Sequence, residues 1–247
     1  MNTTPIPLHD LAHLLTTAFA ADRYTADEQG GIYRPSDRPV QRLGIALEPW
    51  PGLRQWVINN QLDALWLHRP WHLDLTTLPA EVGVLYNHLP FDETLTMGFN
   101  QRLATALDSL GKPETLGFKQ ATDKRGGVLP LRPIGMLFDS AEQEFDDWLD
   151  RVNRLFCGYD RAEMGCQTSI RRIAVVGAMN DALVREAASR GANVYLTGQY
   201  RKPGQAAVDE TGIALIALGH RRTEVWGLRA LADLLGEHVS IDCLVHE

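Results

Sequence analysis

Two short segments of the chain each pair a histidine with a carboxylate four residues later. Near the C-terminus, residues 219–224 (GHRRTE) follow the apolar run 213–218. Earlier, residues 87–92 (NHLPFD) follow the apolar run 82–86. Imidazole and carboxylate groups without thiolate suit zinc, iron, manganese, cobalt or nickel rather than a soft metal ion. The two segments therefore predict four metal ligands: His88, Asp92, His220 and Glu224.

A fifth candidate ligand, His68, stands directly after the apolar run 62–67. Two carboxylates can bridge a pair of ions about 3.5–4 Å apart, and such a pair lowers the pKa of bound water enough for hydrolysis at neutral pH. Each group also has a structural interpretation. A single histidine is often a surface or core residue, and an acidic residue just before a helix is favoured by the helix dipole.

The elements that must position these groups follow from hydrophobic periodicity. An amphipathic helix is predicted over residues 8–20 and an exposed loop over 23–40. Buried strands are predicted over 42–48, 62–67, 82–86, 172–176, 192–196 and 213–218. Helices are predicted over 51–59, 99–110, 181–190 and 226–235. A further strand over 131–138 leads to a helix over 140–155, with Ser140 as its N-cap.

The second half of this pattern repeats the first, which predicts an internal duplication of an α/β unit. We therefore expect an α/β fold of two related lobes, over residues 1–122 with the N-terminal helix and over 123–247, packed closely enough that they could form a single structural unit. Two such lobes facing one another would bring both histidine–carboxylate segments to a shared cleft. Clefts of this kind are common ligand sites.

Composition narrows the classes of function. The net charge of −7 disfavours nucleic acid and anionic membrane as partners, because both need a basic surface. The three cysteines are an odd number without C-x-x-C spacing, which disfavours a disulfide framework and leads us to expect packing roles. With no apparent secretory leader or membrane span, we expect a cytoplasmic protein. Phosphate-loop, dinucleotide and serine-nucleophile motifs are also absent.

Three motifs in order give the chain a resemblance to the NIF-three family, whose members are also described as GTP cyclohydrolase I type 2-like. They are residues 67–71 (LHRPW), 87–92 (NHLPFD) and 219–224 (GHRRTE). The resemblance extends from about residue 40 to 236. It implies a dinuclear metal site in a cleft between two α/β lobes, and a ring-shaped homo-oligomer, typically a hexamer built from dimers. The ligands that it implies are His68, His88, Asp92, His220 and Glu224.

The chain departs from the family pattern at two positions. Arg69 stands where the second histidine of a pair is expected, and Arg221 where a second, non-ligating histidine is frequent. Loss of one imidazole predicts either a single firmly bound ion or two ions bound unequally. Arg69 could instead hold an anionic group of the substrate, since guanidinium binds phosphate and carboxylate bidentately. The structural alternative is an ion pair with a carboxylate such as Asp74.

Three hypotheses follow for function. The first is a metal-dependent hydrolase of a small phosphorylated or heterocyclic substrate, with one or two divalent ions (Zn, Fe, Mn, Co or Ni) and with Arg69 orienting an anion. The second is a non-catalytic metal-binding or protein-interaction ring, which the loss of a ligand at Arg69 favours. The third is opening of the guanine ring of GTP.

Overall fold

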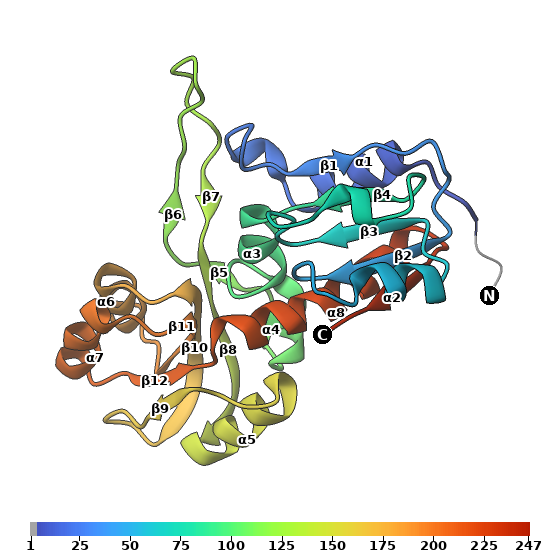
Figure 1. Ribbon diagram of the computed structural model, residues 1–247. Coiled ribbons are helices and arrows are strands. Elements are labelled where there is room, and N and C mark those ends of the chain that lie inside the picture. The colour runs from blue at the N-terminus through green and yellow to red at the C-terminus, as the bar shows by residue number, and fades with distance from the viewer. Residues whose placement is uncertain (1–3) are drawn as a thin grey trace. The chain divides into compact units, whose positions relative to one another are not determined.

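The computed structural model describes residues 4–247, and they fall into two compact units, each with its own sheet (Figure 1). The first unit holds the residues up to Phe91, Ala121–Pro130 and Gly227–Glu247; the second holds Asp92–Gln120 and Leu131–Trp226. The expected boundary at residue 122 falls inside a segment that belongs with the first unit. Among residues 4–247, no helix combines the length and the apolar character needed to cross a membrane.

The first unit is built on a five-stranded sheet with the order β1-β4-β3-β2-β13. Its strands are β1 (Gly31–Arg34), β2 (Arg42–Ala46), β3 (Ala64–Leu67), β4 (Gly83–Tyr86) and β13 (Asp242–Val245). Four of them run parallel and β1 is antiparallel. The accompanying helices are α1 (Leu8–Ala18), α2 (Leu53–Asn59) and the short 3-10 helices η1 (Ala21–Arg23) and η2 (Leu75–Thr77). All four residues of β3 are buried, as expected for a central parallel strand.

The second unit is built on a six-stranded sheet with the order β5-β8-β10-β11-β12-β9. Its strands are β5 (Glu114–Thr115), β8 (Gly135–Glu144), β9 (Arg161–Glu163), β10 (Ser169–Ala178), β11 (Val194–Gln199) and β12 (Ala214–Ala217). Strands β10, β11 and β12 are parallel, and their neighbours β8 and β9 are antiparallel. A separate two-stranded sheet pairs β6 (Phe118–Lys119) with β7 (Arg132–Pro133).

Helices cover both faces of this six-stranded sheet (Figure 1). They are α4 (Gln101–Ala106), α5 (Phe145–Phe156), α6 (Asp181–Ser189), the 3-10 helix η3 (Lys202–Gly204) and α7 (Gln205–Thr211). Val175 of β10 belongs to the core that contains Trp148 of α5, whereas its neighbour Val176 belongs to the core that contains Val184 of α6. Adjacent strand residues point to opposite faces, so both cores draw on the same strands.

The two sheets share a strand order. In each, three consecutive parallel strands (β2, β3, β4 and β10, β11, β12) are flanked at the third strand by an antiparallel strand that precedes them in the chain, β1 or β9. The sheets differ beyond the first parallel strand, where β13 is parallel and β8 antiparallel. This shared order supports the predicted repeat. The chain is an α/β protein with two mixed sheets.

Two expectations about the elements are wrong. Ser140 is not an N-cap, because strand β8 continues to Glu144, where Glu144 pairs with Ser169 of β10, and helix α5 begins only at Phe145. Long-range pairing of β8 with β10 therefore overrides the local capping signal. The loop predicted over 23–40 also contains β1, which pairs antiparallel with β4.

The three cysteines do not all pack in the interior. Cys157 and Cys166 are exposed, whereas Cys243 on β13 is partly buried. Burial, with a smaller contribution from the neighbouring Asp242 carboxylate, raises the pKa of the Cys243 thiol to about 11. The expected packing role therefore holds for Cys243 alone.

This difference predicts a pattern of thiol modification. A thiol with a raised pKa is mostly protonated at pH 8, and only the thiolate reacts. We expect iodoacetamide at pH 8 to alkylate Cys157 and Cys166 readily and Cys243 about a hundredfold more slowly, because its raised pKa leaves very little thiolate. Peptide mass spectrometry over a time course measures the three rates. Equal rates at Cys243 and Cys157 would contradict the burial of Cys243.

Candidate metal centre

Helix α8 (His220–His238) begins at His220 itself, whereas the sequence predicted a helix only from Trp226. Strand β12 ends at Ala217, and Gly219 turns the chain with a φ of +91°. This φ is strained for a residue with a side chain, and a Cβ atom at Gly219 would also lie 2.6 Å from Oδ2 of Asp160, which would have to move. This early start places His220 and Glu224 one turn apart on the same helix.

The imidazole and carboxylate of this pair are in direct contact. Nε2 of His220 lies 3.0 Å from Oε1 of Glu224. The side chain of Glu224 is only 1% exposed, whereas that of His220 is 48% exposed. A buried carboxylate is costly unless a cation or hydrogen-bond donors balance its charge. The pair therefore offers a buried anionic oxygen beside the ring of a half-exposed histidine.

The other segment is also the start of a helix. Helix α3 (Leu89–Leu95) follows His88 directly, and Pro90 in its first turn suits a helix start. Asp92 lies within the first turn of α3. The expectation that Asp92 and Glu224 precede their helices is thus wrong, since both lie inside them. The helical periodicity of apolar residues, which predicted a helix over 99–110, begins only after α3 and corresponds to the separate helix α4.

His68 is fully buried and directly follows β3. Its Nδ1 lies 3.0 Å from the backbone carbonyl oxygen of Asn87. A carbonyl oxygen only accepts hydrogen bonds, so the proton of the neutral ring belongs on Nδ1 and the lone pair on Nε2. In this tautomer, Nε2 of His68 is able to bind a metal ion. The ring centroid of His68 is 4.8 Å from that of His88.

Asn87, which holds the ring of His68, was not singled out by the sequence. Its side chain is buried; Oδ1 accepts from Nε1 of Trp66 at 3.1 Å, and Nδ2 donates to the carbonyl oxygen of Gln29 at 2.9 Å. Groups that orient a metal-binding histidine tune its affinity for the ion. Only its position beside His88 marks Asn87 in the sequence, and that position carries no chemical signal.

We expect Asn87→Ala to weaken binding of Zn²⁺ by roughly tenfold, the low end of the effect of such supporting groups. The substitution removes both side-chain anchors, so the backbone carbonyl that orients His68 becomes less well fixed. Competition against a chromogenic chelator measures the affinity. Asn153→Ala, at an exposed asparagine of α5, is the control. Equal affinities of the two variants would show that Asn87 does not support the site.

The predicted ligand residues form two groups of ligand atoms. Within each group, one nitrogen or carboxylate oxygen from every residue lies within 4.8 Å of the others. One group is His68, His88 and Asp92, and the other is Asp92, His220 and Glu224. Asp92 is common to both. All five predicted ligands are thus present in candidate metal-binding clusters.

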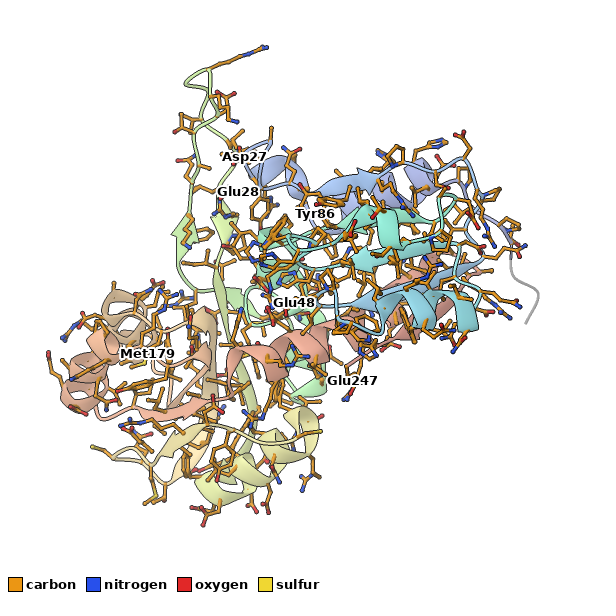
Figure 2. The ribbon with its side chains drawn as sticks, in the orientation of Figure 1. Asp27, Glu28, Glu48, Tyr86, Met179 and Glu247 are labelled. Carbon is orange, nitrogen blue, oxygen red and sulfur yellow. The ribbon has the colours of Figure 1, made fainter. Side chains whose placement is uncertain are left out.

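Arg69 forms an ion pair with Glu48, not with Asp74. Its Nε and Nη2 both lie 2.7 Å from Oε1 of Glu48, which stands just after β2 (Figure 2). Asp74 instead caps the 3-10 helix η2, where it accepts from the backbone N–H of Thr76 at 2.9 Å. The side chain of Glu48 is 47% exposed, so this pair lies at the surface.

Helix α3 carries a second carboxylate, Glu93, which no sequence motif marks. Its Oε2 lies 2.8 Å from Nε of Arg132, and the two side chains are only 10% and 7% exposed. Nζ of Lys119 is 4.0 Å from the other carboxylate oxygen. The negative charge of Glu93 is therefore balanced by basic side chains, which gives this residue a structural role next to the candidate ligand Asp92.

Two mixed sheets and clusters of histidine and carboxylate groups at the ends of β3, β4 and β12 define an α/β protein with a candidate metal centre. Residues 72–246 match the family model described as Duf34/NIF3 (NGG1p interacting factor 3). This match covers more than half of the chain, which therefore belongs to the Duf34/NIF3 family. The resemblance inferred from the three sequence motifs is confirmed.

Relatives and solved structures agree with this assignment. The chain is 24% identical to the "GTP cyclohydrolase 1 type 2 homolog" of Allochromatium vinosum, with 98% of this chain and 96% of that protein covered. It is 31% identical to the protein of the same name from Neisseria meningitidis serogroup B, with 74% of each covered. The structure of protein ybgI, of unknown function, is similar in fold, with a TM-score of 0.71, 18% identity and 98% of both chains covered.

Proposed function

We propose that this protein is a metal-dependent hydrolase of a small phosphorylated or heterocyclic substrate. The observation that carries the proposal is the pair of ligand groups that share Asp92, because three suitable donor atoms within 4.8 Å of one another match the donor set of a catalytic metal ion. His68, His88, Asp92, His220 and Glu224 would hold the metal. The tautomer of His68 fits this role, since its Nε2 carries the lone pair.

The donor set suits one or two divalent transition-metal ions: zinc, iron, manganese, cobalt or nickel. Such an ion acts as a Lewis acid that polarises a substrate oxygen and activates water for hydrolysis. The residues of the chain would position the ion and supply the negative charge that retains it. Arg69 replaces an imidazole expected in the family pattern, which supports one strongly bound ion or two bound unequally.

Arg69 is proposed to orient an anionic group of the substrate. The Glu48 side chain of its ion pair is 47% exposed, whereas that of Arg69 is 19% exposed. An anionic group of a ligand could pair with the guanidinium beside Glu48 or in exchange for it, since guanidinium binds phosphate and carboxylate bidentately. Arg69→Met is expected to raise KM for an anionic substrate and leave the bound metal unchanged, whereas Arg69→Lys retains part of the affinity.

The test is a turnover screen of the metal-loaded protein against nucleotides, phosphoesters and cyclic amides, with GTP ring opening followed by its ultraviolet absorbance. His220→Ala is expected to lose both metal and turnover. Unchanged metal content in His220→Ala would contradict the ligand assignment. Stoichiometric metal without turnover on the whole panel would contradict the hydrolase and favour the alternative, a non-catalytic metal-binding protein that docks partners.

We also propose a ring-shaped homo-oligomer, which the membership of the Duf34/NIF3 family supports. Analytical ultracentrifugation of the full chain is expected to give the mass of a hexamer. A monomer at micromolar concentration would contradict this part of the proposal.

A further inference from the structure

Trp71 differs from the other tryptophans of the chain. The chain has six, and Trp71 is the exposed one among them, with 51% of its surface accessible. Trp66 and Trp148 are fully buried, and the remaining three are partly buried. Tryptophan is enriched at contact surfaces, because its large apolar ring also carries an N–H donor. The neighbours of the Trp71 ring therefore indicate which kind of ligand it could contact.

The ring of Trp71 is held in place although it is exposed. Trp71 is the second residue of a turn closed by a hydrogen bond from the backbone N–H of Leu73 to the carbonyl oxygen of Pro70, at 3.0 Å. Its ring meets Tyr86 edge to face, with centroids 5.7 Å apart and an angle of 76°. Tyr86, at the end of β4 (Figure 2), meets Tyr33 in the same manner, with ring centroids 5.8 Å apart. The turn sets the backbone at Trp71, and the contact with Tyr86 restrains the indole.

The same ring adjoins a candidate metal ligand. The centroids of Trp71 and His88 are 5.9 Å apart, at an angle of 80°. Arg69, the proposed anion-binding residue, lies two positions earlier in the chain. An exposed aromatic ring beside the candidate ligand, with a guanidinium nearby in sequence, is suited to a ligand that has both a planar ring and a negative charge.

We propose that Trp71 is a substrate-positioning residue that stacks on a planar nitrogen heterocycle. This inference rests on the proposed function and narrows its substrate to ring compounds, as opposed to aliphatic phosphoesters. Stacking of a base on an aromatic side chain changes affinity by roughly ten- to a hundredfold. The indole face would hold the ring, and the restrained orientation of Trp71 would reduce the entropy lost on binding.

Equilibrium dialysis of the full-length protein with adenosine, guanosine and ribose tests the inference. Trp71→Ala is expected to weaken binding of both nucleosides by at least about tenfold, and Trp71→Phe by only a few fold because a smaller aromatic face remains. Ribose, which has no planar ring, should bind too weakly to detect in every variant. Phe118→Ala removes an aromatic side chain that is 53% exposed elsewhere in the chain, and it should leave nucleoside affinity unchanged.

Two measurements distinguish a wrong role for Trp71 from a wrong proposed function. Metal content is measured in each variant, and dialysis is repeated on metal-free protein, so nucleoside binding is determined with and without the ion. Equal nucleoside affinity of wild type and Trp71→Ala, or no nucleoside binding by wild type, would overturn the role of Trp71 whatever the metal content. A loss of oligomer mass in Trp71→Ala with unchanged nucleoside affinity would assign the ring to a contact between copies and overturn it as well.

Discussion

Replacement of Glu224 by glutamine is expected to weaken Zn²⁺ binding by about a hundredfold or more. Loss of a ligand should exceed the roughly ten- to hundredfold effect of losing a group that only supports a ligand. The amide keeps the size of the side chain but has no negative charge. The Glu224 side chain is 1% exposed and its Oε1 lies 3.0 Å from Nε2 of His220, so the amide would leave the ligand group of Asp92, His220 and Glu224 with one buried negative charge fewer. Isothermal titration of the metal-free protein measures the loss.

The matched control for this change is Asp233→Asn, at an exposed position of the same helix α8. It removes an equal charge from the same helix, so a general electrostatic effect would appear in both variants. We expect wild-type affinity for Asp233→Asn. Similar losses in the two variants would mean that net charge, not ligation by Glu224, sets the affinity.

Replacement of Arg132 by methionine is expected to cost about 3–5 kcal/mol of unfolding free energy. Both side chains of the Arg132–Glu93 pair are at least nine-tenths buried, and the variant leaves the Glu93 carboxylate without its closest cation. Glu93 lies on α3 beside Asp92, so the helix that carries a candidate ligand would also be perturbed. Urea titration followed by circular dichroism measures the change.

A second substitution separates the pair from the packing of Arg132. In Arg132→Met with Glu93→Gln the buried charge is removed, and most of the lost stability should return. Arg125→Met, at an exposed arginine, should stay within about 0.5 kcal/mol of wild type. If the double variant were as unstable as Arg132→Met, the loss would come from packing and not from an unbalanced carboxylate.

The candidate ligands were predictable because their positions follow from local patterns. His68 and His88 each follow a short apolar run, and such runs form the parallel strands β3 and β4. The carboxyl ends of parallel strands lie at one edge of a sheet, so groups placed just after them approach one another. The i, i+4 spacing of His220 and Glu224 then needs only a helix to bring the two side chains together.

Features set by distant contacts were not predictable in this way. Strand β13 pairs with β2 across most of the chain length, and Ser140 lies in β8 because of its pairing with β10. Neither leaves a local signal. The partner of Arg69 is Glu48 because β2 and β3 are neighbours in the sheet, whereas proximity in sequence favoured Asp74. The support of His68 by Asn87 likewise depends on the pairing of β3 with β4.

We expect this member of the Duf34/NIF3 family to hold a divalent transition-metal ion on the residues around Asp92. Elemental analysis by mass spectrometry tests it most directly, on protein purified without chelators or nickel affinity resin. The predicted result is a stoichiometric amount of zinc, iron, manganese, cobalt or nickel per chain. A protein that contains none of these metals, and that retains none after incubation with each and gel filtration, would contradict this expectation.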